Sequence, residues 1–365
     1  MGQSVVAFPP MALLPRLLLW ASYHFRGPAL CDTLRGADIK VLMYHGISRR
    51  TQFDKLTNCF GYNVPAAEFE AQLDYLHRQC NVVSLRDLRS ARGLSGKKTN
   101  VILTFDDGYE NNYTTAFPLL KRYGMPAVYA LPTAFVCGRE PLWNDIIEYA
   151  INESAREGVS LHWNGTGHEF KLTGARGRFA LYRWMMRECT QMDQDRRDAL
   201  IGLAAGELQV SINSEAIFKD EDYRPLTREQ VREMSESGLI EFASHSVHHY
   251  ALSKFNTAGQ RFELRESKRQ IEEWTGIPCT AFCVPGGAYN HEVLEEAFSA
   301  GYESVLTSDV GNTTAGRRVI NRLGVFHKDG IYKFADQVHG PVLKLLAMSR
   351  RARGSVRKRF RKAVT

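Results

Sequence analysis

Two short polar motifs in the 365-residue sequence combine residue types that could carry out hydrolytic chemistry. The first motif, TFDDGY at residues 104–109, places Asp106 and Asp107 side by side before a glycine that permits a tight turn. Adjacent side chains point in different directions, so one carboxylate could bind a metal while the other takes a proton from water. A DDG sequence on its own is also typical of a solvated turn.

The second motif, SHSVHH at residues 244–249, contains His245 and His249 four positions apart. On one helical turn such a pair presents both imidazoles on the same face, with a spacing suited to zinc, and His248 falls outside that face. Two histidines and one aspartate leave a coordination position open for water, as a catalytic metal requires. An isolated HxxxH pair is also common on surface helices, so the prediction depends on both motifs meeting in space.

The surrounding chain predicts that they do meet. From Asp38 onward, short β-branched runs alternate with helical patterns, which is typical of parallel strands joined by helices. Both motifs directly follow predicted strands, and the carboxyl ends of barrel strands share one face. The predicted strands are 39–45, 100–105, 126–131, 239–243, 280–284 and 303–307, and the predicted helices are 66–79, 110–123, 227–237, 257–274 and 292–300.

The alternation fails between Cys137 and about Tyr223, and this stretch is predicted to be a mostly helical insertion at about 138–223. The chain is therefore expected to hold one α/β domain at 38–340. An apolar segment, 1–37, precedes it, and its stretch Met11–Phe25 is shorter than the roughly 20 residues that span a membrane. We expect an interfacial or packing helix there, with a signal peptide or a single anchor as alternatives.

The positive charge is concentrated at the end of the chain. The formal charge is +7, and residues 341–365 hold nine Lys or Arg and no acidic residue, so the rest sums to −2. This basic tail, which also carries apolar residues, predicts contact with an anionic membrane surface, or a solvated tail as the alternative. No nucleic-acid partner is expected, because the charge lies away from the motifs.

Seven widely spaced cysteines do not suggest a disulfide framework, which favours a reducing compartment. We therefore expect a cytoplasmic protein, peripheral at the inner face of the membrane. A periplasmic or membrane-anchored protein is the alternative.

With these motifs in view, the sequence resembles the polysaccharide deacetylases of carbohydrate esterase family 4, the NodB-homology domain. The resemblance covers about residues 39–330 and includes LMYHGIS, FEAQLDYLHRQCNVVSL and VPGGAYN. It implies a distorted (β/α) barrel and a divalent metal, with zinc as the expected ion. It also implies that Asp106 is the general base and that the metal ligands are Asp107, His245 and His249.

The sequence departs from that family in its third motif, FCVPGGAYN at residues 282–290. Cys283 stands where an arginine usually braces the base, and Gly286 stands where an aromatic residue is usual. Arg322, at the end of a late strand, is our candidate for the brace, although it could be an ordinary surface arginine. The backbone N–H of Gly286 could still donate to the oxyanion.

Two further site residues are predicted from their positions. His45 ends the first strand and is the preferred donor of a proton to the leaving amine, with His327 as the second choice. A core histidine bonded to backbone is the alternative for His45. Trp143, with Asn144 and Asp145 at the mouth of the insertion, could stack on a sugar or simply pack in the protein.

Taken together, these observations predict a metal-dependent hydrolase that removes acetyl groups from N-acetylated sugars of a polysaccharide or glycolipid. Two other functions remain open. One is a catalytically silent carbohydrate-binding module that keeps the fold, which the intact ligand residues disfavour. The other is a hydrolase of cyclic amides or imides on the same barrel.

Overall fold

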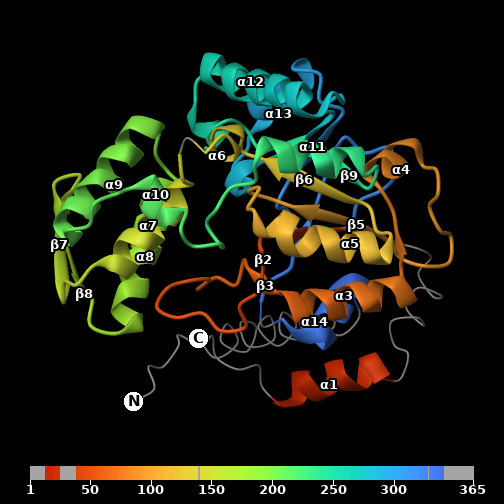
Figure 1. Ribbon diagram of the computed structural model, residues 1–365, viewed down its shortest axis with the longest axis horizontal. Coiled ribbons are helices and arrows are strands. Elements are labelled where there is room, and N and C mark those ends of the chain that lie inside the picture. Colours follow the sequence, from red (N-terminus) through yellow and green to blue (C-terminus); the bar gives the residue numbers. More distant parts are fainter. Residues whose placement is uncertain (1–12, 25–37, 139, 328, 341–365) are drawn as a thin grey trace, which may run out of the picture.

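The central feature of the molecule is a curled parallel sheet with helices packed around it (Figure 1). The structure is a computed structural model that describes residues 13–24, 38–138, 140–327 and 329–340. Within these residues nine strands form the sheet in the order β12–β11–β10–β9–β6–β5–β1–β13, with β4 also paired to β5. The strands are β1 (Ile39–Tyr44), β4 (Asn81–Val82), β5 (Asn100–Phe105), β6 (Ala127–Leu131), β9 (Ile240–Ser244), β10 (Ala281–Cys283), β11 (Ser304–Leu306), β12 (Val319–Ile320) and β13 (Leu323–Gly324).

The two ends of this sheet are brought together by one short run of chain. β12 pairs with β11 at one end, and β13 pairs with β1 at the other. Only Asn321 and Arg322 separate the two strands in sequence, so the sheet must curl until its edges nearly meet. This geometry confirms the predicted distorted (β/α) barrel.

Helices cover the outside of the curled sheet, and most begin and end where the sequence predicted. α3 buries Phe69, Leu73 and Leu76, which recur at helical spacing. The predicted helix 110–123 instead starts as a π-helix, η1, because the proline at the start of α5 cannot donate a backbone hydrogen bond. The elements are α3 (Ala66–Gln79), α4 (Leu85–Ser90), η1 (Asn112–Ala116), α5 (Phe117–Tyr123), α11 (Arg228–Glu236), η2 (Leu252–Lys254), α12 (Thr257–Thr275), η3 (Pro285–Gly287), α13 (His291–Ser299) and α14 (Gly330–His339).

The insertion between β6 and β9 forms a lobe at one side of the barrel, with a hydrophobic cluster of its own (Figure 1). Its helices are α7 (Trp143–Glu153), α8 (Ala175–Cys189), α9 (Gln194–Leu208) and α10 (Ser214–Ile217), whereas the short α6 (Thr133–Val136) lies beside the barrel. The prediction of a mostly helical insertion missed an antiparallel hairpin, β7 (Gly158–Trp163) and β8 (Thr166–Lys171). Asn164 and Gly165 connect these strands with φ of 51° and 76°, the conformation that an Asn-Gly hairpin turn favours.

The apolar N-terminal helix, α1 (Leu13–His24), packs against α14 on the outside of the barrel. Its Tyr23 ring lies 5.1 Å from the ring of Tyr332 and 5.7 Å from that of Tyr75. Among the described residues, none of the helices has the length and apolar character needed to cross a membrane. The basic tail, 341–365, lies outside the described residues. Two further short strands, β2 (Ile47–Ser48) and β3 (Val64–Pro65), pair with each other.

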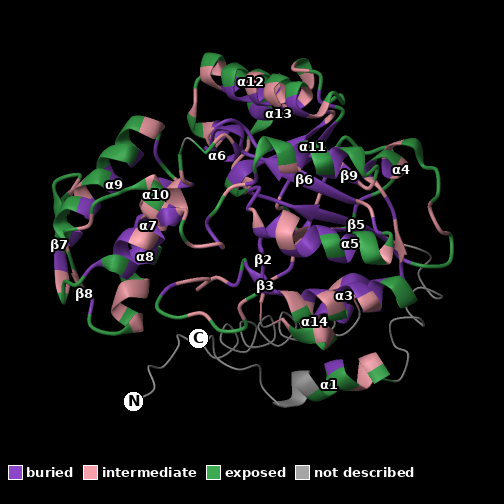
Figure 2. Ribbon diagram, in the orientation of Figure 1, coloured by how far each residue is buried: buried purple, intermediate pink, exposed green. Residues whose placement is uncertain are grey.

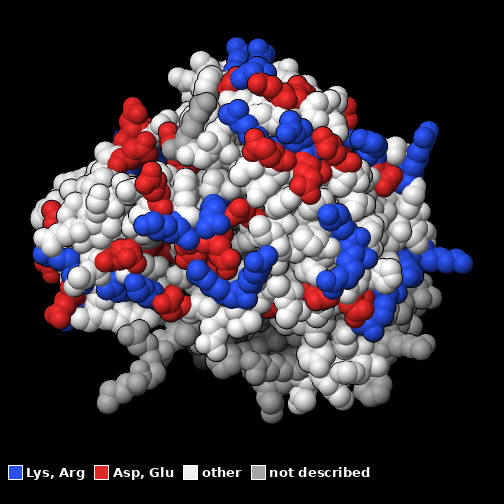
Figure 3. Space-filling model, viewed as in Figure 1, with Lys and Arg blue, Asp and Glu red and all other residues white. Residues whose placement is uncertain are grey.

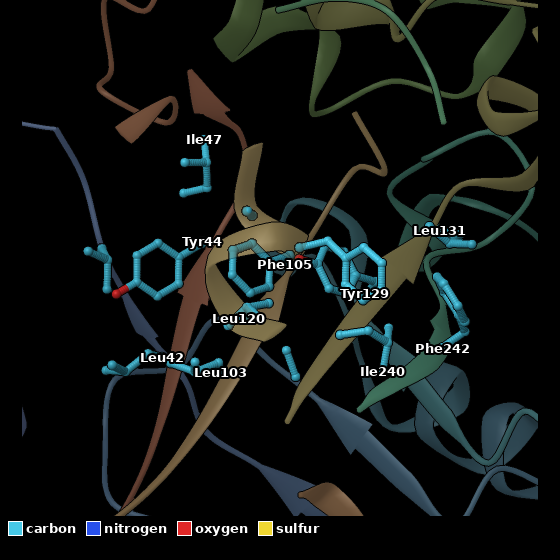
Figure 4. Packing of buried hydrophobic residues seen from close by; sticks show 14 of the residues in the cluster. Leu42, Tyr44, Ile47, Leu103, Phe105, Leu120, Tyr129, Leu131, Ile240 and Phe242 are labelled. Carbon is cyan, nitrogen blue, oxygen red and sulfur yellow. The ribbon is translucent and has the colours of Figure 1, made fainter. Parts of the chain in front are cut away.

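The main hydrophobic core lies between the sheet and the helices packed around it, and the strands are almost wholly buried (Figure 2). Phe105, the last residue of β5, stacks between two tyrosines of neighbouring strands (Figure 4). Its ring centroid lies 5.2 Å from that of Tyr44 and 4.6 Å from that of Tyr129. Since Phe105 immediately precedes the DDG motif, this stack fixes the position at which the two aspartates emerge.

Truncation of that ring tests the packing. We expect Phe105→Ala to lower the free energy of unfolding by about 3–5 kcal/mol, because it leaves a cavity in a fully buried aromatic stack. Phe262→Ala is the matched control, since that ring is 55% exposed and its loss should change stability by less than about 0.5 kcal/mol. Denaturant unfolding measures both variants. Equal stability of the two would contradict the packing described here.

Candidate active site

Three side chains from two strand ends converge at one end of the barrel. Asp107 follows β5, and His245 and His249 follow β9. Oδ1 of Asp107 lies 3.6 Å from Nε2 of His245 and 3.3 Å from Nε2 of His249. One ligand atom from each residue lies within 4.8 Å of the other two, a spacing that a single metal ion could bridge. The structure thus brings the three predicted metal ligands together.

The two histidines meet through a loop, so the predicted helical turn is wrong. Residues 245–251 form no helix, and Ser246 and His249 have positive φ values of 63° and 58°. Glu263 of α12 holds this loop by accepting hydrogen bonds from the backbone N–H of Val247 (2.8 Å) and His248 (3.1 Å). The Nδ1 of His248 lies 2.6 Å from the same carboxylate, so His248 is directed away from the cluster, as predicted.

The protonation states favoured for the two histidines suit metal binding. Burial lowers the pKa of His245 and of His249, which keeps the imidazole lone pairs free. The Nδ1 of His245 lies 2.8 Å from the carbonyl oxygen of Cys283, and this contact turns Nε2 toward Asp107. Burial and the neighbouring Asp106 raise the pKa of Asp107, whose buried Oδ1 has no hydrogen-bond partner. Such a donor set of two imidazoles and one carboxylate fits a divalent cation, zinc included.

Asp106 points to a different partner. Arg322 donates to both of its carboxylate oxygens, with Nη1 2.7 Å from Oδ1 and Nη2 2.8 Å from Oδ2. Both side chains are buried, and Arg322 also donates to the carbonyl of Thr307 at 3.0 Å. Burial alone would raise the pKa of Asp106, but the guanidinium charge holds it well below its usual value. The residue proposed as a brace therefore contacts the residue proposed as the base.

The two candidate proton donors lie in different surroundings. His45 is close enough to Asp106, Arg322 and His245 for their charges to influence it, and burial lowers its pKa to about 4. Its Nδ1 is buried without a hydrogen-bond partner, which disfavours the alternative of a core histidine bonded to backbone. The ring of His327 instead faces Glu68, with Nδ1 3.1 Å from its carboxylate. Of the two, His45 belongs to the site.

A pocket of about 420 Å³ opens beside the metal ligands. Its wall includes His249, Trp143 and Gly286, so it joins the metal cluster to the insertion and to the third motif. Trp143 donates its indole N–H to the carbonyl of His249 at 3.2 Å. Gly286 has a φ of 58°, and the space that a side chain would occupy there is open. Both predicted substrate-contacting residues thus line the same pocket.

This geometry agrees with comparisons to known proteins. A family model described as polysaccharide deacetylase matches residues 94–196 and 208–305, more than half of the chain. The chain belongs to the polysaccharide deacetylase family. As a member of this family, it is a hydrolase that acts on carbon–nitrogen bonds other than peptide bonds.

Relatives and solved structures of this polysaccharide deacetylase point the same way. The YxkH protein of Bacillus subtilis (strain 168), assigned as a polysaccharide deacetylase, is 24% identical over 78% of this chain and 69% of its own. The deacetylase PplD of Streptococcus pyogenes, solved in complex with acetate, shares 19% identity with a TM-score of 0.54, covering 84% of this chain and 100% of its own. IcaB of Ammonifex degensii matches with 19% identity and a TM-score of 0.51, covering 84% and 98% of the two chains.

Two contributors to the deacetylase site escaped sequence reasoning. Glu263, which holds the histidine loop, was missed among the many charged residues of a long helix, although it shares the buried face of that helix with Leu264 and Ile271. Arg197, a buried residue of α9, lines the pocket from within the insertion. Asp145 was named only for its position and accepts a hydrogen bond from Tyr109 at 3.0 Å.

Metal content tests the ligand assignment. We expect the purified protein to hold about one divalent metal per chain, most of it zinc, because an Asp/His₂ set with an open position is a catalytic zinc site. Replacing either His245 or His249 by Ala should abolish both metal and activity. His248→Gln is the matched control and should keep the metal, since that imidazole contacts Glu263. Metal and turnover that survive the double replacement of His245 and His249 would show that the ligands are wrong.

Proposed function

We propose that this polysaccharide deacetylase is a divalent metal enzyme, with zinc as its ion, that removes acetyl groups from N-acetylated sugars of a polysaccharide or glycolipid. The observation that carries this proposal is the pairing of the Asp107, His245 and His249 cluster with a separate, arginine-bound Asp106. One carboxylate is available to a cation while the other is held beside it for proton transfer. Acetate bound to the streptococcal relative is the acid that such a reaction releases.

In the proposed reaction water attacks the acetyl carbonyl and Asp106 accepts its proton. When bound, the divalent metal polarises the carbonyl and lowers the pKa of water at the site. Arg322 keeps Asp106 ionised at neutral pH and fixes both of its oxygens. The backbone N–H of Gly286 is proposed to donate to the carbonyl oxygen as negative charge develops there. Breakdown of the resulting tetrahedral intermediate then breaks the carbon–nitrogen bond and yields acetate and a free amine.

The departing nitrogen requires a proton, and we propose that His45 supplies it. With a pKa of about 4, His45 is neutral near pH 7, so it donates only after it has received a proton during the same turnover. Asp106, which takes a proton from water in the first step, lies close enough to influence the pKa of His45, and we propose it as the source of that proton. The low pKa of His45 then makes the transfer to an amine favourable.

The rival functions differ in what they release. A silent carbohydrate-binding module would bind N-acetylated oligosaccharides without acetate release, and a cyclic amide or imide hydrolase would open a ring and release no acetate. Acetate release from a panel of N-acetylhexosamine polymers, lipid-linked sugars and nucleotide sugars separates the deacetylase from both rivals and identifies the substrate class. Absence of acetate from every N-acetylated substrate would reject the proposed function.

The division of labour between the two aspartates gives a direct test. Asp106→Asn should keep the metal and lower kcat by roughly 10²- to 10⁴-fold, because a general base contributes about that factor. Asp107→Asn should instead weaken metal binding, since it removes the charge of a ligand. Metal analysis and acetate release are measured on both variants. Equal loss of metal from the two would show that the roles are not divided in this way.

We further propose that the enzyme works at an anionic membrane surface, as a peripheral protein of the cytoplasmic face. Figure 3 shows basic and acidic side chains interspersed over the described part of one face, whereas the tail holds nine basic residues and no acidic ones. α1 adds apolar surface, for Leu17 is 53% exposed and Trp20 is 45% exposed. Two such weak contacts can together give reversible binding. A periplasmic or membrane-anchored location is the alternative.

Vesicle binding tests this location. Deleting residues 341–365 should release the protein from vesicles that contain anionic lipid, because each basic side chain near such a surface contributes about 1 kcal/mol. Release should be most visible at raised salt, since salt screens the remaining charges. Turnover of a small soluble substrate should stay nearly unchanged, and Leu17→Ser with Trp20→Ser separately tests α1. Binding that responds neither to the deletion nor to salt would exclude this role for the tail.

A further inference from the structure

A buried arginine in the insertion has two donor nitrogens without a hydrogen-bond partner. The side chain of Arg197, in α9, is 2% exposed, and its Nε and Nη2 atoms are buried without a hydrogen-bond partner in the described structure. The acid next to it in sequence, Asp198, is exposed, and its Oδ1 lies 3.7 Å from Nε, beyond hydrogen-bond distance. Buried guanidinium donors left unsatisfied are costly, so such a group is normally retained for a ligand or a network.

Aromatic rings hold this guanidinium in place. Its central carbon lies 3.9 Å from the ring centroid of Tyr250 and 5.5 Å from that of Trp143. Tyr250 directly follows the ligand His249, and Trp143 donates to the carbonyl of His249. Aromatic rings contact the faces of a guanidinium, whereas its N–H groups lie in the guanidinium plane and stay available as donors. The arginine is therefore oriented and still able to donate.

Arg197 lies in the wall of the pocket that joins the metal cluster. Arg197 lines this pocket of about 420 Å³ together with His249, Gly286 and the exposed Lys254. None of the pocket residues is acidic, so its two cations have no counter-charge within the wall. A planar guanidinium matches the two oxygens of a carboxylate or phosphate better than any other ligand chemistry.

We infer that this pocket binds an anionic group of the substrate, a carboxylate or a phosphate, and that Arg197 is the residue that recognises it. This inference rests on the proposed function and adds the substrate class to it: an N-acetylated sugar that carries or adjoins an acidic group. Because His249 belongs to both sites, the anion lies on the acetylated sugar itself or on its immediate neighbour.

Substrate preference provides the test, with kcat/KM for acetate release measured at constant ionic strength. The three arms are neutral chitotetraose, a tetrasaccharide that alternates N-acetylglucosamine with glucuronate, and N-acetylglucosamine 1-phosphate. We expect the unmodified enzyme to prefer one acidic arm by roughly 10- to 100-fold, the factor that charge-assisted hydrogen bonds provide. Preference for the glucuronate tetrasaccharide indicates that the pocket binds a carboxylate, and preference for N-acetylglucosamine 1-phosphate indicates that it binds a phosphate.

The variants assign the preference to Arg197. Arg197→Gln should bring the ratio of acidic to neutral kcat/KM close to 1, mainly through KM, and Arg197→Lys should retain part of it. Arg318→Gln is the matched control, because Arg318 also stacks on an aromatic ring, 3.7 Å from the centroid of Phe298, and is absent from the pocket wall. A purely structural Arg197 would lower the melting temperature and change all three arms equally.

Each failure has its own signature. If neutral and acidic substrates react equally with the unmodified enzyme, the inference about Arg197 is wrong and the deacetylase function stands. If no substrate releases acetate, the proposed function fails, and calorimetry then decides on Arg197 by comparing N-acetylglucosamine 1-phosphate with N-acetylglucosamine and the glucuronate tetrasaccharide with chitotetraose. Tighter binding of either acidic ligand that is lost in Arg197→Gln supports the inference, and equal binding in both pairs overturns it. The comparison in the unmodified protein still decides if that variant does not fold.

Discussion

The buried ion pair between Asp106 and Arg322 is the constraint on which the rest of the site depends. Asp106 directly follows β5, an interior strand of the sheet, and Arg322 lies in the run that links the two edges of the sheet. Two charges removed from water are tolerated only when they pair with good geometry. Here Nη1 and Nη2 of Arg322 each donate to one carboxylate oxygen of Asp106. The pair can form only if the sheet is curled, so closure of the barrel and positioning of the base are one requirement.

The same pair accounts for the electrostatics of the metal cluster. Because Arg322 pairs with Asp106, Asp107 has no cation among its contacts, its Oδ1 has no donor, and its pKa is raised. The neighbouring His245 and His249 are kept neutral by burial and supply no compensating charge. A divalent cation would satisfy all three at once. Two adjacent aspartates thus acquire different chemistry from a single arginine that contacts only one of them.

Sequence reasoning succeeded where a local pattern determines the structure. α3 and β5 have the predicted bounds because apolar periodicity and a buried β-branched run leave no competing structure. The hairpin of β7 and β8 was missed although its Asn-Gly turn was visible, because the surrounding segment was judged by its helical composition. The histidine loop could not be predicted, since its shape depends on Glu263, a residue brought near only by packing of α12. Burial of Arg197 could likewise not be predicted, because the neighbouring sequence does not distinguish a buried arginine from an exposed one.

The barrel and the insertion divide the site between them. The barrel supplies the metal ligands and the base from strand ends whose positions are fixed by closure of the sheet, and such positions tolerate little change. The insertion has a hydrophobic cluster of its own and reaches the site through Trp143 and Arg197. Residues there can vary without disturbing the Asp106–Arg322 pair, because they contact the histidine loop through its backbone and through Tyr250. Recognition of the substrate can therefore change in this fold while the chemistry stays constant.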